Sequence, residues 1–141
     1  MTSFKTYSLL FALVSYSVFS VSCTMTVTKV KDPAFRLETK AIQDDLKKIV
    51  TCQHINLSGK EKTSGGKTVS ELEISIINGT NIPQDNAQLK TLGKEIASDI
   101  KKSLKDANEY NRYKVLFVTV VKNGSFTRKN WRSDEFESGD L

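Results

Sequence analysis

The chain has 141 residues with 21 basic and 16 acidic side chains, which leaves room for one folded domain and excludes a multidomain enzyme. Hydrophobic residues make up 38% of the chain, which suffices for a modest core and argues against wholesale disorder and against many membrane spans. No motif in the chain identifies a biochemical activity.

The first element is an apolar N-terminal segment. Residues 7–21 hold no charged side chain, but this run is shorter than the roughly 20 residues of a membrane-spanning helix. Ser20 and Ser22 stand where a signal peptidase requires small side chains. We therefore predict a signal peptide over residues 1–22, with cleavage before Cys23.

Ser22 directly before Cys23, at the end of an apolar block, resembles the lipobox of bacterial lipoproteins. The family usually carries an aliphatic residue where this chain has Ser20. The resemblance covers residues 1–23 and implies that the Cys23 thiol receives a diacylglycerol, whose acyl chains, such as palmitate, hold the protein at a membrane of the cell envelope. Thr24, in place of an acidic residue, implies the outer membrane.

Cys23 and Cys52 are the two cysteines of the chain, and they offer a second interpretation. If Cys23 stays unmodified, a bridge to Cys52 would close a loop of about 29 residues and stabilise the fold by about 3–4 kcal/mol. The protein would then be a secreted ligand-binding or inhibitor module. If Cys23 is acylated, we expect Cys52 to be a small, buried, unpaired thiol.

The net charge of the mature chain is mild. Removing residues 1–22 takes away Lys5 and no acidic residue, so 20 basic and 16 acidic side chains remain, a net charge of +4. Nucleic-acid binding requires a basic stripe and access to the cytosol. We therefore expect no nucleic-acid partner, and we expect no cofactor.

A tether and a helix are predicted first in the mature chain. Residues 23–32 are expected to be the lipidated cysteine and an extended tether, although residues 24–31 would equally suit a short edge strand. Asp32 and Pro33 form a helix start, with an N-cap carboxylate and a first-turn proline. Apolar residues at helical spacing follow, so a helix is predicted over residues 33–50.

Two strands follow. The alternation after Cys52 predicts a strand with Ile55 and Leu57 on its inner face. The stretch 59–67 has three glycines and no apolar residue, which predicts a mobile hairpin loop. The next run alternates with period two and predicts an antiparallel strand with one wet face. Its expected inward residues are Leu72, Ile74 and Ile76, and its expected outward residues are Glu71, Glu73 and Ser75.

A second helix is the most strongly patterned element. Asp85, with Gln88 three residues later, resembles a capping box. An apolar stripe then continues for about six turns, which is typical of an amphipathic helix lying on a sheet. The stripe consists of Leu89, Leu92, Ile96, Ile100, Leu104 and Ala107.

The chain ends in a predicted hairpin. Residues 113–121 are apolar on both faces, as expected of a central strand, and Asn123-Gly124 is a strong two-residue turn signal. Pairing across this turn would set Val121 opposite Phe126 and Leu116 opposite Trp131.

These elements predict an α+β fold in one domain over residues 33–141. We expect a two-layer sandwich of a four-stranded, mainly antiparallel sheet with two helices on one face, in the order αββαββ.

Three motifs suggest chemistry, and each has a simpler interpretation. Gly65-Gly66-Lys67-Thr68 lacks the first glycine of a phosphate-binding loop and is expected to be a solvated turn. His54 is the single histidine, and a zinc site with several histidine ligands is therefore excluded. A catalytic pair of His54 and Cys52 would make the protein a small hydrolase, but we expect an ordinary histidine on the face of a sheet. Glu71 and Glu73 share a strand face and would suit two-carboxylate hydrolysis, but we expect them to solvate the sheet.

The final hairpin holds the best candidate for a partner-binding patch. Trp and Arg dominate interface energetics, and this hairpin carries Phe126, Arg128, Trp131 and Arg132. The simpler interpretation, which we favour, is that Trp131 packs in the core. The leading hypothesis is a non-enzymatic envelope lipoprotein whose small domain binds or supports another envelope component.

Overall fold

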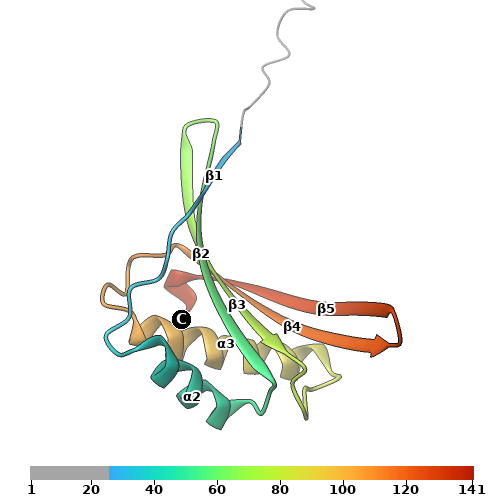
Figure 1. Ribbon diagram of the computed structural model, residues 1–141. Coiled ribbons are helices and arrows are strands. Elements are labelled where there is room, and N and C mark those ends of the chain that lie inside the picture. The colour runs from blue at the N-terminus through green and yellow to red at the C-terminus, as the bar shows by residue number, and fades with distance from the viewer. Residues whose placement is uncertain (1–25) are drawn as a thin grey trace, which may run out of the picture.

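The structured domain combines five strands with two helices (Figure 1). The computed structural model describes residues 26–141, so the predicted signal peptide and Cys23 lie outside the described residues. The elements are β1 (Val27–Val30), α2 (Thr39–Ile49), β2 (His54–Ser64), β3 (Lys67–Ile77), α3 (Asn86–Ser103), β4 (Arg112–Asn123), β5 (Phe126–Glu137) and the short 3-10 helix η1 (Ser138–Asp140).

The sheet is mixed, with strand order β1-β2-β3-β4-β5. All neighbouring strands are antiparallel except β3 and β4, which are parallel. The prediction of an α+β fold is confirmed. The predicted four-stranded, mainly antiparallel sheet in the order αββαββ differs in detail, because a fifth strand precedes α2 and one strand pair is parallel. A parallel pair arises because α3 carries the chain back along the sheet, so that β4 begins at the same end as β3. The fifth strand is β1, which forms in the segment expected to be a tether.

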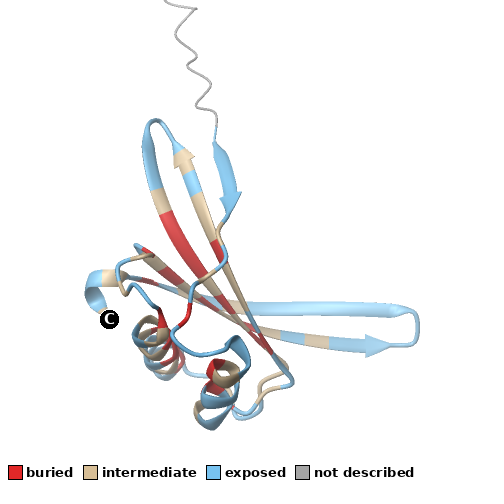
Figure 2. Ribbon diagram, turned by 60° about the vertical axis from the view of Figure 1, so that its left-hand side comes forward, coloured by how far each residue is buried: buried red, intermediate tan, exposed pale blue. Residues whose placement is uncertain are grey.

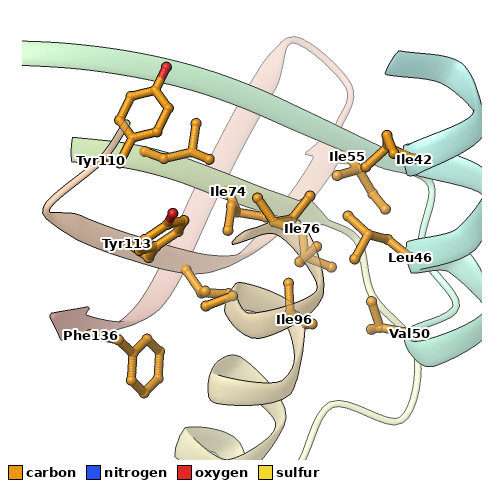
Figure 3. Close-up of a cluster of buried hydrophobic side chains, with 14 of the residues drawn as sticks. Ile42, Leu46, Val50, Ile55, Ile74, Ile76, Ile96, Tyr110, Tyr113 and Phe136 are labelled. Carbon is orange, nitrogen blue, oxygen red and sulfur yellow. The ribbon is translucent and has the colours of Figure 1, made fainter. Parts of the chain in front are cut away.

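The core lies between one face of the sheet and the two helices (Figure 3). Ile42 and Leu46 of α2 and Ile96 of α3 are buried against Ile74 and Ile76 of β3. The predicted inward residues of the first hairpin are confirmed, since Ile55 and Leu72 are also buried and Leu57 packs against the core. Burial of this apolar face contributes about 25 cal/mol for each Å² removed from water.

Helix α2 begins at Thr39, later than the predicted start at Pro33. The residues before it form an extended segment along the end of α3, where Phe35 makes an isolated bridge with Leu104. The N–H of Arg36 donates to the carbonyl of Ser103 at 2.9 Å. The extended segment buries the Phe35 ring, and its backbone hydrogen bonds to the end of α3 satisfy polar groups that an earlier helix start would satisfy within the helix. These contacts outweigh the local helix-start signal.

The predicted mobile loop over residues 59–67 is instead mostly strand. β2 continues to Ser64, and the hairpin closes in a two-residue turn of Gly65 and Gly66, whose φ angles are 57° and 76°. Positive φ at both positions is what a type I′ hairpin turn requires. Cross-strand ion pairs favour the strand, because Lys60 and Lys62 reach carboxylates on β3. A strand follows the turn, so the phosphate-loop interpretation is wrong.

Helix α3 has the predicted cap. The Asp85 side chain accepts a hydrogen bond from the N–H of Gln88 at 2.9 Å, which satisfies one of the unpaired donors of the first turn. The apolar stripe faces the sheet, with Leu89, Ile96 and Ile100 buried. The helix ends at Ser103, and Leu104, its C-cap residue, is fully buried.

The β4–β5 hairpin exists, but its register differs from the prediction by two residues. Asn123 pairs with Phe126, so the turn residues are Gly124 and Ser125 and not Asn123 and Gly124. Gly124 has φ 59°, and glycine at the first turn position is typical of a type II′ hairpin. As a result Trp131 lies opposite Val118, and Val121 lies opposite Arg128. The even shift leaves every side chain on its expected face.

The two long hairpins diverge from the helix-covered region (Figure 1). The β2–β3 hairpin and β1 extend in one direction, and the β4–β5 hairpin extends in another. Figure 2 shows that buried residues concentrate above the helices, whereas the outer part of the β4–β5 hairpin is exposed. The chain therefore presents a strand pair to solvent without a helix behind it.

Candidate functional site

The outer half of the β4–β5 hairpin, residues 119–131, is the most exposed apolar and basic segment of the described chain. We call these residues the arm. All of them are exposed except Val120, which is half-buried. The arm projects because β3 ends at Ile77, which pairs with Val118, so β4 beyond that point has β5 as its only neighbour.

The arm carries positive charge and no negative charge. Its basic residues are Lys122, Arg128 and Lys129, Arg132 stands at its base, and no acidic residue lies between positions 119 and 132. Clustered basic side chains on a narrow projection create a local positive potential that attracts acidic surfaces.

Two large aromatic side chains of the arm are exposed. Phe126 beside the turn is 81% exposed and Trp131 is 67% exposed. The expectation that Trp131 packs in the core is therefore wrong. The helices cover one face of the sheet, and the side chain of Trp131 lies on the opposite face, because Trp131 is an odd number of residues from the buried Phe136 of the same strand.

The register divides the four predicted patch residues between two faces. Residues opposite each other in an antiparallel pair share a face, and Tyr113 opposite Phe136 marks the face that packs on the helices. Phe126 and Arg128 lie an even number of residues from Phe136 and share its face. Trp131 lies on the other face, opposite Val118. The structure thus brings Phe126 and Arg128 together and separates Trp131 from them.

Arg132 serves as a brace at the base of the arm. Its Nη2 donates to the carbonyl of Pro83 at 2.7 Å, and its Nη1 donates to the carbonyl of Gln84 at 3.3 Å. These bonds tie β5 to the loop before α3. Arg132 also lines a hollow of about 320 Å³ with Ile82, Phe117 and other residues of this loop and of β4. Its guanidinium is therefore engaged within the domain, unlike that of Arg128.

The two carboxylates considered for hydrolysis are each paired with lysine. Glu71 Oε1 lies 3.1 Å from Lys62 Nζ, and Glu73 Oε2 lies 3.0 Å from Lys60 Nζ. Glu71 is buried. Both carboxylates are therefore engaged in ion pairs between β2 and β3, a geometry that suits stabilisation of the hairpin.

Cys52 and His54 do not form a catalytic arrangement. Cys52 is half-buried before β2 and packs against the core, and burial raises the pKa of its thiol. A thiol held protonated is a weak nucleophile. His54 begins β2 and is exposed. Within residues 26–141, no group of three or more His, Cys, Asp or Glu side chains is gathered as a metal site.

Sequence reasoning missed two features of the arm. One is the open edge of β5, which becomes visible only when β5 is found at the end of the strand order. The other is the anchoring role of Asn78, whose side-chain oxygen accepts a hydrogen bond from the N–H of Val120. The absence of acidic residues from 119 to 132 was a sequence signal for an exposed arm.

Comparisons with known proteins give little further information. No protein-family model matches the chain, and no curated protein matches it. Among solved structures, the "Crystal structure of Sex pheromone staph-cAM373 precursor" is similar over 95% of this chain, with 14% sequence identity and a TM-score of 0.45. The chain spans 46% of that protein's chain. In the described region, neither helix has the length and apolar character needed to cross a bilayer.

Proposed function

We propose that this protein is a membrane-anchored envelope lipoprotein, whose α+β domain is a non-enzymatic module that binds another envelope component through the arm. The exposure of Phe126 and Trp131 carries this proposal. Large exposed aromatic side chains beside arginine are characteristic of protein interfaces, where they supply most of the binding energy.

The anchoring part of the proposal rests on the apolar leader and on Ser22 before Cys23. β1 begins at Val27, four residues after Cys23, so the connection to an acylated cysteine could extend at most about 15 Å. Lipid on Cys23 would therefore hold the domain close to the membrane surface. We expect the anchor to lie in the outer membrane, because Thr24 and not an acidic residue follows Cys23.

The position of Cys52 supports an anchored protein over a secreted one with a Cys23–Cys52 disulfide. Val27 pairs with Thr63 near the tip of the first hairpin, whereas Cys52 precedes the other end of β2. The nine residue steps from His54 to Thr63 correspond to about 30 Å along the strand. A disulfide requires Cα atoms within about 7 Å of each other, and the four residues from Cys23 to Val27 are too short to cover the difference.

Detergent partition tests the anchor. In cells that process lipoproteins, the wild-type chain should enter the detergent phase, and Cys23→Ala should move it to the aqueous phase. Mass spectrometry of the mature wild-type chain should find a diacylated Cys23 and a free thiol at Cys52. Recovery of an unacylated N-terminus, or of a Cys23–Cys52 disulfide, would contradict the proposal.

Site-specific photo-crosslinking tests the binding surface. A photoreactive amino acid at position 126 should give a discrete adduct with an envelope component in intact cells, and Arg128→Ala, a change on the same face of the arm, should weaken it. The control position is Thr91, which is exposed on α3 and should give no adduct. Equal labelling at both positions, or none at position 126, would show that the arm has no specific partner.

A further inference from the structure

β5 is a long open edge of the sheet. It is the last strand in the order, spans Phe126–Glu137 and has β4 as its only neighbour. An unpaired edge of this length is a template for another strand, and natural proteins either shield such edges or use them for association.

The backbone groups on the open side of β5 belong to its odd-numbered residues. The N–H of Ser138 donates to the carbonyl of Asn111 at 2.7 Å, in the same register as the pairs of the β4–β5 ladder. In an antiparallel ladder alternate residues bond to the neighbouring strand, so the even-numbered residues of β5 bond to β4. The N–H and C=O groups of Thr127, Lys129, Trp131, Ser133 and Glu135 therefore face outward.

The charges of β5 divide by sign along the strand. Its first half carries Arg128, Lys129 and Arg132, and its second half carries Asp134, Glu135 and Glu137. Two copies of such a strand attract each other when they lie antiparallel, because the basic half of one then lies beside the acidic half of the other.

We propose that two copies of this chain associate through β5 in an antiparallel pair centred on Trp131, which joins their sheets into one. A two-fold axis perpendicular to the sheet places odd-numbered residues opposite odd-numbered ones, as the outward backbone groups require. Trp131 then lies opposite Trp131 of the second copy, and Arg128 lies opposite Asp134 of the second copy. Because only the edge is used, both faces of the arm stay available.

Charge selects this register over its neighbours. Within the described residues Glu135 is paired with Lys114 and Glu137 with Arg112, whereas Arg128 and Asp134 have no ion pair. Centring on Trp131 brings these two unpaired side chains together twice. Centring on Arg132 would place two guanidinium groups opposite each other, which is unfavourable. Centring on Ser133 would place Arg132 opposite Asp134 of the second copy, but the Arg132 guanidinium already donates to the carbonyls of Pro83 and Gln84.

Charge exchange tests the pairing in the mature chain, residues 23–141 with Cys23→Ala to prevent acylation, which contains the whole core. This protein should be a dimer in sedimentation equilibrium. Arg128→Glu alone and Asp134→Arg alone each create two like-charge contacts across the axis, and each should raise the dimer dissociation constant about tenfold or more. An equimolar mixture of the two variants should dimerise again, because both contacts are then opposite in charge.

The single tryptophan provides a second readout. Trp131 fluorescence should change with concentration in the Cys23→Ala protein and in the mixture, and in either variant alone the same change should require a concentration about tenfold higher or more. Lys122→Glu changes a charge of the arm outside the contact and should leave dimerisation unchanged. Circular dichroism establishes that every variant is folded. A monomeric Cys23→Ala protein at about 1 mM, or a mixture no more dimeric than its components, would overturn the proposal.

Discussion

The side-chain oxygen of Asn78 accepts a hydrogen bond from the backbone N–H of Val120 at 2.7 Å. Asn78 follows the last residue of β3, and its own N–H donates to the carbonyl of Val118 at 2.8 Å. It therefore extends the parallel β3–β4 ladder by one residue beyond the end of β3 and fixes β4 where the arm begins.

Two substitutions of Asn78 should distinguish the contribution of its side-chain hydrogen bond to stability from the contribution of its backbone conformation. Its φ is 52°, which glycine tolerates and alanine does not. Asn78→Gly should lower the free energy of unfolding by about 1–3 kcal/mol, since the Val120 N–H loses its partner. Asn78→Ala should cost about 1 kcal/mol more. Urea unfolding measures both values, and an alanine variant more stable than the glycine variant would contradict this account.

The two buried tyrosines should respond differently to loss of their hydroxyl groups. Tyr110 Oη donates to the carbonyl of Lys31 at 3.0 Å, so Tyr110→Phe should cost about 1–2 kcal/mol of unfolding free energy. Tyr113 Oη is buried without a hydrogen-bond partner among the described residues, so Tyr113→Phe should be neutral or slightly stabilising. Thermal unfolding compares the pair, and equal losses would refute the distinction.

Stability should fall at alkaline pH. Burial raises the pKa of Tyr113 to about 12 and raises the pKa of Tyr110 as well, whereas an unfolded tyrosine titrates near pH 10. Below that pH both states hold these protons, so the stabilisation is fully present. Between about pH 10 and 12 the unfolded state releases protons that the folded state retains, and the free energy of unfolding decreases. In the Tyr110→Phe, Tyr113→Phe double variant, the free energy of unfolding should decrease less steeply with pH over this range. An unchanged slope would show that these tyrosines do not cause the decrease.

Gly59 should not tolerate a side chain. A Cβ at this position would overlap the carbonyl oxygen of Lys31 and the hydroxyl of Tyr110, where β2 meets the segment after β1. Gly59→Ala should lower the free energy of unfolding by about 3 kcal/mol. Gly139→Ala is the matched control, because a Cβ there meets no atom within 4 Å. Guanidinium unfolding measures the free energy of unfolding of both variants. A Gly59→Ala variant as stable as the Gly139→Ala control would be inconsistent with this packing.

Trp131 should contribute to association and not to folding of the monomer. Because its side chain is 67% exposed, Trp131→Ala should change the free energy of unfolding by less than about 0.5 kcal/mol at concentrations where the protein is monomeric. Leu46→Ala in the core is the contrasting variant and should cost about 2–5 kcal/mol. A loss of several kcal/mol from Trp131→Ala would mean that Trp131 supports the fold.

Local patterns in the sequence determined the elements that depend on neighbours along the chain. The capped helix α3 was predictable because Asp85 and the apolar stripe act within a few turns, and the inward residues Leu72, Ile74 and Ile76 were predictable because strand alternation is local. The two-layer α+β class follows from these elements, since each has one apolar face that must be covered.

The tertiary structure alone decided the features that depend on contacts distant in sequence. α2 begins late because Phe35 packs beside Leu104, and β1 forms because the β2 edge is available to it. The apolar pattern around Trp131 is the same whether or not a helix covers its face of the sheet, so only the tertiary structure could show that α2 and α3 pack on the opposite face. The open edge of β5, with its divided charge, likewise exists only because β5 is the last strand of the sheet, and strand order is a long-range property that local propensity does not encode.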